Sequence, residues 1–343
     1  MGISLGVTLT TTDDASTCIA TNYNGVGCRN NGTDYTTLTF RNGARNVPLW
    51  EILRCCTAAP YYFTPHHIAG TGTFQDGGLA FNNPAAIALK EAGLLFPTPT
   101  ELSIVVSLGT GSTSQKRSGD GGSLWSSLFP ARLFRAFWRQ SDSAAAWEQL
   151  LRHQKLEKRG DFFRFDVRFG ADQPALDDVG SMREVARMAR EIALGSTEMR
   201  RLAKCFRANL FFLELDTGSP LIMRCGTYHC TGRLRCRLRA ESEELRVLLT
   251  QLHRSSAVFK CQGQAPLAAS SGGDGSSDAI RFEKDIAVEV PDLQHAFSIT
   301  LEEESTASNI SGSPFTLDRL QKQQRLYAPF GTAYHRERHF ACK

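Results

Sequence analysis

The sequence lacks the features of several large classes of protein. No apolar run reaches the roughly 18–20 residues that a membrane-spanning helix needs. The first residues show no basic start followed by an apolar stretch, which a secretory signal would have. Ten cysteines among 343 residues are too few for a disulfide scaffold and have no regular spacing. We therefore expect a cytoplasmic protein whose thiols are mostly reduced.

The sequence also lacks a large excess of charge of either sign. Lysine and arginine number 39 and aspartate and glutamate 35, a net charge of +4. This excess is too mild to indicate nucleic-acid binding, and we expect no nucleic-acid partner. It is compatible with peripheral contact to an anionic membrane surface.

The first half of the chain has the pattern of an α/β domain. Residues 102–112 read LSIVVSLGTGS, a continuous apolar run that ends at a glycine turn. Such a run is typical of a buried strand in a parallel sheet. Upstream, Asn83 and Pro84 open an alanine-rich helix that we expect to end at Gly93.

The second half changes in character. A long basic helix is predicted over Met182–Phe206, with a break at Gly195. After it, short β-like runs alternate with turn residues. We therefore place a partial α/β domain with C-terminal helices at residues 1–205 and a β-rich region at residues 206–343, with a flexible insert near residues 268–278.

The strongest local signal is the sequence DGG at residues 76–78. Asp76 leaves a short predicted strand and meets two glycines, which can adopt positive φ. Such a turn holds a carboxylate in the fixed position that a general base needs. We expect Asp76 at the end of a strand, Gly77 or Gly78 at positive φ, and a helix starting near Pro84. Taken alone, the tripeptide is also common in ordinary turns.

Three further motifs accompany this one. Residues 57–63 read TAAPYYF, residues 82–85 read NNPA and residues 106–111 read VSLGTG. In this order and spacing, the set resembles the patatin-like phospholipase family over roughly residues 1–112. Weaker likeness continues beyond it, where Trp147 and residues 162–169 are similar to the segment after the core in fungal members.

The resemblance implies a fold and a function. The fold is an incomplete patatin-like α/β hydrolase core with a parallel-type sheet, followed by helices and the β-rich C-terminal region. Asp76 is then the base of a Ser–Asp dyad, which activates a serine to attack an ester carbonyl. The implied substrate is a phospholipid or another acyl ester, hydrolysed in lipid metabolism without a metal or an organic cofactor.

The chain departs from the family at the nucleophile. Patatin-like enzymes place a glycine-rich oxyanion loop and a G-x-S-x-G elbow well before the D-G-G motif. The one G-x-S-x-G match here is centred on Ser4, and strand-forming residues come after it. An elbow needs a strand before the serine and a helix after it. We therefore expect the C-terminal part of a catalytic domain, inactive by itself, whose 103–108 strand lacks neighbours.

Two alternatives remain open. One is a non-catalytic remnant that binds a lipid surface or a protein, with Asp76 kept as a turn residue. The other is an α/β-hydrolase triad of Ser4, Asp76 and His153, which shares the difficulty at Ser4.

Two segments have the pattern of a binding surface. Leu124–Gln140 combines an aromatic stripe with a basic stripe, and we expect it to pack on the protein rather than on lipid. Four arginines, at residues 233, 235, 237 and 239, alternate with apolar residues. On a strand they share one face, which is either a solvated face or a site for phosphate groups or an acidic partner.

Overall fold

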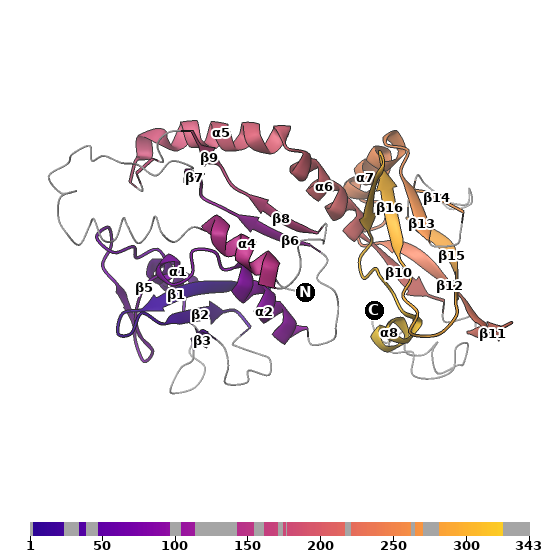
Figure 1. Cartoon of the computed structure of the whole chain (residues 1–343), viewed down its shortest axis with the longest axis horizontal. Coiled ribbons are helices and arrows are strands. Elements are labelled where there is room, and N and C mark those ends of the chain that lie inside the picture. Colours follow the sequence, from indigo (N-terminus) through magenta and orange to yellow (C-terminus); the bar gives the residue numbers. More distant parts are fainter. Residues whose placement is uncertain are drawn as a thin grey trace. The chain divides into compact units, whose positions relative to one another are not determined.

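The computed structural model describes residues 3–23, 34–38, 47–96, 104–113, 143–153, 161–170, 174–175, 177–216, 221–261, 265–269 and 281–324. The chain forms two compact units, one of residues 1–100 with 106–193 and one of residues 101–105 with 194–343. Figure 1 labels their elements. The expected helix at Leu124–Gln140 and nearly all of the insert at 268–278 lie outside the described residues. Within the described part, no helix is long and apolar enough to cross a bilayer.

The first unit is built on a five-stranded sheet with the order β3-β2-β1-β5-β4. Its strands are β1 (Gly6–Thr11), β2 (Thr17–Thr21), β3 (Thr36–Thr37), β4 (His66–Ile68) and β5 (Gly72–Asp76). The central strand β1 pairs antiparallel with both β2 and β5, and β4 pairs antiparallel with β5. The short β2–β3 pair is parallel. The expected parallel-type sheet is therefore present only in part, because a tight turn joins β1 to β2 and forces a hairpin.

Two helices accompany this sheet. Helix α1 (Leu49–Cys56) contacts β1, β4 and β5 and buries Ile52 and Cys55. Helix α2 (Ala85–Leu95) begins directly after Pro84, as the sequence predicts. The expected end at Gly93 is wrong, because the helix continues to Leu95. Leu94 and Leu95 are half-buried, so their packing favours two further residues of helix.

The apolar run after α2 forms strand β6 (Val105–Leu108), which pairs with β8 (Phe162–Phe165). Its expected burial is wrong, since Val106 is 37% and Leu108 75% exposed. Among the described residues β8 is the one strand that pairs with β6, so one edge and much of one face stay open. Nearby lie a parallel pair, β7 (Ser112–Thr113) with β9 (Arg168–Phe169), and helix α4 (Ser143–His153).

The predicted break at Gly195 is confirmed. Helix α5 (Met182–Gly195) ends there, and helix α6 (Thr197–Asn209) begins two residues later. Ser196 caps α6, because its side chain accepts a hydrogen bond from the Met199 N–H.

The second unit contains two antiparallel sheets. In the first, β12 (Thr227–Cys236) pairs with β10 (Phe211–Leu215), β11 (Ile222–Arg224) and β15 (Glu283–Val290). The second has the order β14-β13-β16-β17, with β13 (Val258–Cys261), β14 (Leu267–Ala268), β16 (Ile299–Glu303) and β17 (Thr306–Asn309). Helices α7 (Glu243–Arg254) and α8 (Leu317–Gln323) complete it.

One large apolar core holds the second unit together. Alternate residues of β15, including Ile286 and Val288, are buried. The rings of Phe211, Phe259 and Phe282 meet at centroid distances of 4.8 to 5.7 Å. These elements and helix α7 contribute side chains to the same cluster.

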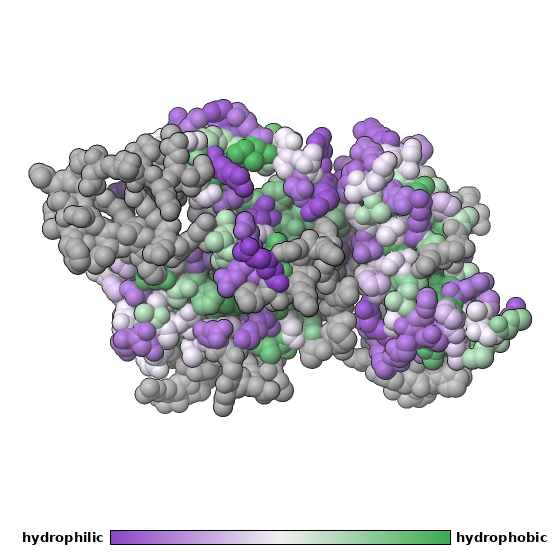
Figure 2. Space-filling view, in the orientation of Figure 1, coloured by the Kyte–Doolittle hydropathy of each residue, from purple (hydrophilic) through white to green (hydrophobic). Residues whose placement is uncertain are grey.

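The arginines of β12 are paired within their own sheet. Arg233 lies 3.0 Å from Glu283, and Arg235 lies 2.9 Å from Glu214 on β10. The guanidinium of Arg237, the residue after β12, lies over the Phe212 ring. These pairs favour a charged, solvated sheet face over a phosphate site. On the visible face of the second unit, hydrophilic residues lie interspersed with apolar ones (Figure 2).

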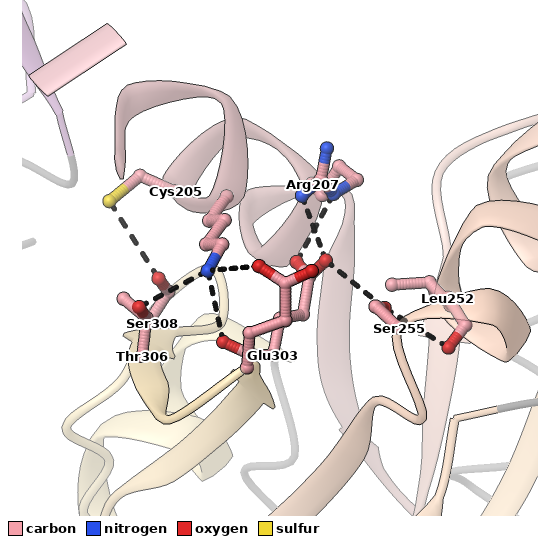
Figure 3. A network of polar contacts seen from close by, with 9 residues as sticks. Cys205, Arg207, Leu252, Ser255, Glu303, Thr306 and Ser308 are labelled. Atoms are coloured by element: carbon pink, nitrogen blue, oxygen red, sulfur yellow. Dashed lines mark hydrogen bonds and ion pairs between the residues drawn. The ribbon is translucent and has the colours of Figure 1, made fainter. Parts of the chain in front are cut away.

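A buried ion pair fastens helix α6 to the β16–β17 hairpin (Figure 3). Glu303 is 3% exposed and accepts two hydrogen bonds from Arg207, at 3.1 and 2.8 Å. Ser255 donates a third, at 3.4 Å. Lys204 donates to the main-chain oxygen of Glu303 and to the Thr306 hydroxyl. The Glu303 carboxylate is thus fully compensated by its surroundings.

Candidate active site

The structure places Asp76 at the last position of β5, which confirms the prediction that it ends a strand. Its main-chain N–H donates to the Ala58 oxygen at 3.1 Å, and its main-chain oxygen accepts from the Thr10 hydroxyl at 2.8 Å. The strand register sets Leu9 of β1 opposite Asp76. Contacts from β1 and from the residues after α1 therefore hold the backbone of Asp76 in place.

The turn after Asp76 differs from the expectation. Neither Gly77 nor Gly78 has positive φ, and Gly77–Leu79 forms a short 3-10 helix, η1. The prediction of positive φ is therefore wrong. Glycine is needed at position 77 because a Cβ there would collide with the main-chain carbonyl of Thr8. The two glycines thus allow close packing against β1 and leave the Gly78 N–H pointing at the carboxylate.

The carboxylate of Asp76 is half-buried and sparsely compensated. Its Oδ1 accepts one hydrogen bond, from the Gly78 N–H at 2.7 Å. Burial raises the pKa of Asp76 above its usual range, and the Gly78 hydrogen bond partly opposes that rise. Within the described part of the chain, no cation pairs with Asp76 and Oδ2 accepts no hydrogen bond. The second oxygen is therefore available to take a proton.

A thiol lies close to this carboxylate. Burial raises the pKa of Cys56, and the negative charge of Asp76 raises it further. A cysteine attacks as the thiolate, which both effects disfavour. Cys56 is therefore a neutral neighbour of Asp76 and a poor nucleophile.

Ser4 does not meet Asp76. The Asn22 N–H donates to the Leu5 oxygen at 3.1 Å, which continues the β1–β2 ladder before Gly6, and the Leu5 N–H donates to the Asn22 side-chain oxygen at 2.8 Å. Ser4 is exposed and lies on this extended stretch, five residues before the partner of Asp76. At strand spacing, that separation is about 16 Å.

The local structure around Ser4 is also unsuitable for an elbow, since a strand and not a helix comes after it. The triad of Ser4, Asp76 and His153 fails at the same step. Among the described residues, no hydroxyl donates to the Asp76 carboxylate.

Asn83, in the expected N-N-P motif, connects α2 to the following elements. Its Oδ1 accepts from the Ala85 N–H at 3.1 Å, at the start of α2, and from the Ser107 hydroxyl at 3.3 Å. Its Nδ2 donates to the main-chain oxygen of Ser143 at 3.0 Å. Asn83 and Ser107 are both 7% exposed, so this polar junction is buried.

Two residues that the sequence reasoning missed extend this junction. Arg164 donates to the hydroxyls of Ser107 and Ser143, at 2.7 and 2.8 Å, and lies 3.4 Å from Asp166. Asp166 accepts the Gly111 N–H at 2.7 Å. The Gly109 N–H donates to the Phe165 oxygen at 2.7 Å, so the G-T-G turn at residues 109–111 is held by contacts within the chain. The glycines of this turn indicated it in the sequence, whereas no local motif indicated a role for Arg164 or Asp166.

Comparison with known proteins supplies the family of this region. The family model for patatin-like phospholipases matches residues 11–89, which include Asp76. Calcium-independent phospholipase A2-gamma of mouse is 44% identical over 69 residues, and the human protein is 42% identical over 69 residues. Each of these matches covers 20% of this chain and 9% of the relative.

A plant protein shows a longer and weaker likeness. Phospholipase A I of Arabidopsis thaliana is 32% identical over 101 residues, which are 29% of this chain and 6% of that protein. The matched part of this chain thus spans less than a tenth of the length of these relatives. Residues 11–89, with Asp76 at the end of β5, thus match the patatin-like phospholipase family.

Proposed function

We propose that Asp76 is the catalytic base of an acyl-ester hydrolase that acts on phospholipids or related acyl esters. The observation that carries this proposal is the fixed, half-buried carboxylate of Asp76 inside the family match. The base accepts a proton from a serine hydroxyl while the serine oxygen attacks the ester carbonyl. The protonated carboxyl gives this proton to the oxygen of the departing alcohol, which leaves an acyl-enzyme. The carboxylate then takes a proton from water, whose oxygen attacks the acyl carbon, and returns it to the serine oxygen as the carboxylic acid is released.

The surroundings of Asp76 suit that role. Burial raises the pKa of the carboxyl, which makes it a stronger proton acceptor than a solvated aspartate. The Gly78 N–H holds Oδ1 in place, and Oδ2 remains open among the described residues. No metal ion or organic cofactor takes part in this scheme.

We further propose that the nucleophile is not Ser4, and that this chain carries the C-terminal part of the catalytic domain. Support comes from the separation of about 16 Å along β1 and from the strand after Ser4. The exposed apolar residues of β6 support it as well, because that strand has an open edge in the described part of the chain. A carboxylate without a positioned hydroxyl cannot form an acyl-enzyme. Loss of even one oxyanion donor costs roughly 2.7–4 kcal/mol in kcat.

Activity assays on the purified 343-residue chain test the second proposal. A short-chain nitrophenyl ester and a phospholipid are the substrates, and the proteins are the wild type, Ser4→Ala and Asp76→Asn. We expect background rates for all three. Clear wild-type activity that both substitutions abolish would contradict the proposal, because it would show a working Ser4–Asp76 pair.

A further inference from the structure

An exposed apolar surface lies on α1 and on the loop after it. Large apolar side chains there face solvent, with exposed fractions of 62% for Trp50, 64% for Tyr61 and 57% for Phe63. We call this surface the aromatic patch, and it consists of Leu49, Trp50, Leu53, Tyr61, Tyr62 and Phe63. Exposed apolar groups are common singly, but such a gathering marks a surface that binds something.

Contacts join α1 to the aromatic loop, and hydrogen bonds fix the backbone of that loop. The guanidinium of Arg54, one helical turn after Trp50, stacks over the Phe63 ring at 5.7 Å. The Trp50 ring lies 6.2 Å from the ring of His66. The N–H groups of Tyr62 and Phe63 both donate to the Ala59 oxygen, at 3.1 and 3.0 Å. Helix and loop therefore present their aromatic groups as one surface.

The patch adjoins the candidate base. The Ala58 oxygen, which accepts the Asp76 N–H, lies between the helix and the aromatic loop in the chain. Cys56, on the last turn of α1, is close enough for the Asp76 charge to raise the pKa of its thiol. A large molecule bound to the patch would therefore be held beside the carboxylate.

The charges around the patch favour one kind of partner. Residues 47–72 contain a single acidic residue, Glu51, which is half-buried and lies 3.9 Å from His66. Arg54, His66 and His67 are the basic residues of the same stretch. Tryptophan and tyrosine are the side chains enriched where proteins meet the lipid–water boundary. Residues 47–72 thus combine an aromatic surface with a cation and no exposed carboxylate, and the Asp76 carboxylate beside them is half-buried. This combination complements an anionic lipid surface.

We propose that the aromatic patch is the surface by which this chain docks on an anionic phospholipid bilayer. The choice of a lipid partner rests on the proposed function. The docking itself needs no hydrolysis, since it depends on the patch and not on the Asp76 carboxylate. Docking would hold the Asp76 turn at the membrane surface, where acyl esters are present at high local concentration.

Co-sedimentation with vesicles tests this proposal. The probes are phosphatidylcholine vesicles with and without phosphatidylserine. The test variant is Trp50→Asp with Phe63→Asp, at positions exposed enough to accept a charge; aspartate in the first turn also suits the start of α1. Met223→Asp is the matched control, because Met223 is a 60% exposed apolar residue of β11 in the other unit.

We expect the wild type and Met223→Asp to bind the phosphatidylserine vesicles, and the double variant to bind at least about tenfold more weakly. If circular dichroism shows that the double variant is unfolded, Tyr61→Asn replaces it. Tyr61 has φ of 72°, which asparagine tolerates well. This single change is expected to weaken binding in the same direction by a smaller factor.

Three results would overturn the proposal: no vesicle binding by the wild type, equal binding by the patch variants, or equal loss in Met223→Asp. A wild-type dimer in light scattering that the patch substitutions dissociate, without vesicle binding, would assign the surface to a second copy. Asp76→Asn is included and is expected to bind vesicles like the wild type. Vesicle binding that depends on the patch therefore supports docking even if Asp76 proves not to be a base. Loss of the docking proposal likewise leaves the proposed role of Asp76 unaffected.

Discussion

The two units of this protein differ in how many hydrogen bonds they provide to a carboxylate that is removed from solvent. In the second unit, Glu303 is 3% exposed and receives two hydrogen bonds from Arg207 and one from Ser255. In the first unit, Asp76 is half-buried and its carboxylate has one hydrogen bond, from a main-chain N–H. Full compensation is what a structural charge requires, whereas a sparsely compensated one with a raised pKa is typical of a functional site.

The two units also differ in how completely they bury their apolar side chains. The second unit gathers its buried residues from both sheets and α7 into one large cluster. In the first unit, the clusters formed by described residues are smaller, one around Leu9 and α1 and another around Ile19 and α2. This unit also leaves β6 and the aromatic patch exposed. Among the described residues, the first unit therefore exposes more large apolar side chains than the second, which still exposes a few, such as Phe206 and Met223.

Breaking the Glu303 ion pair should have the largest effect on stability. In Glu303→Gln, the charge of Arg207 loses its carboxylate, which for a buried pair costs about 3 kcal/mol in the free energy of unfolding. Urea unfolding of the full chain, followed by circular dichroism, measures the loss. Glu304→Gln is the matched control, because the Glu304 side chain is 71% exposed and its pair with Lys204 is worth less than about 1 kcal/mol. Equal losses in the two variants would contradict the structural role assigned to Glu303.

A methyl group at position 77 should have the next largest effect. In Gly77→Ala, the new Cβ meets the main-chain carbonyl of Thr8, so β1 or η1 must shift, at a cost of about 2 kcal/mol. The control is Gly93→Ala, because Gly93 lies inside α2 with no other atom near its Cβ position. That change should stabilise the chain by about 0.5–1 kcal/mol. Thermal unfolding of both variants checks the pair, and a harmless Gly77→Ala would refute the close-packing explanation.

The smallest expected effect is a pH-dependent gain in stability from Asp76→Asn. Burial raises the pKa of Asp76 in the folded state above its ordinary value of 3.8. Between the pKa of Asp76 in the unfolded chain and its higher pKa in the folded chain, the folded chain binds the proton more tightly. The free energy of unfolding therefore falls as the pH rises through this range. Asparagine stays neutral and still accepts from the Gly78 N–H.

Asp76→Asn should therefore unfold at a higher temperature than the wild type at neutral pH, and the difference should vanish below pH 3.8. Glu303→Gln has the opposite sign at neutral pH, which sharpens the contrast between the two carboxylates. A lower melting temperature for Asp76→Asn at neutral pH would mean that the Asp76 charge is compensated after all.

Local sequence patterns predicted the ends of strands and helices that depend on one or two neighbouring residues. They predicted the strand end at Asp76, the helix after Pro84 and the break at Gly195, because aspartate, proline and glycine act on their own backbone neighbours. At β6 they predicted the strand but not the exposure of its side chains, because an apolar run does not show how many neighbours a strand has. The expectation that this strand lacks neighbours came from the family resemblance, and β8 is its one partner among the described strands. Local patterns also misjudged Gly77, since D-G-G permits either positive φ or a close approach and only the packing of β1 decides.

Contacts between residues that are distant in the chain could not be predicted from the sequence. Arg164 contacts Ser107, 57 residues away, and Asp166 contacts Gly111, 55 residues away. No local motif marks either charged residue. The location of the candidate base was therefore predictable, whereas the polar junction around Asn83 that supports the neighbouring elements required the fold.

The most direct test of the central claim, that Asp76 is a catalytic base, is an exchange of segments. Residues 11–89 replace the corresponding segment of the mouse phospholipase A2-gamma, and phospholipid hydrolysis is measured for the chimera and for its Asp76→Asn and Asp14→Asn forms. Asp14 is the control, an exposed aspartate of the same segment. We expect an active chimera, unchanged activity in Asp14→Asn, and at least about a hundredfold loss in Asp76→Asn. An active chimera that keeps its rate in Asp76→Asn would contradict the claim.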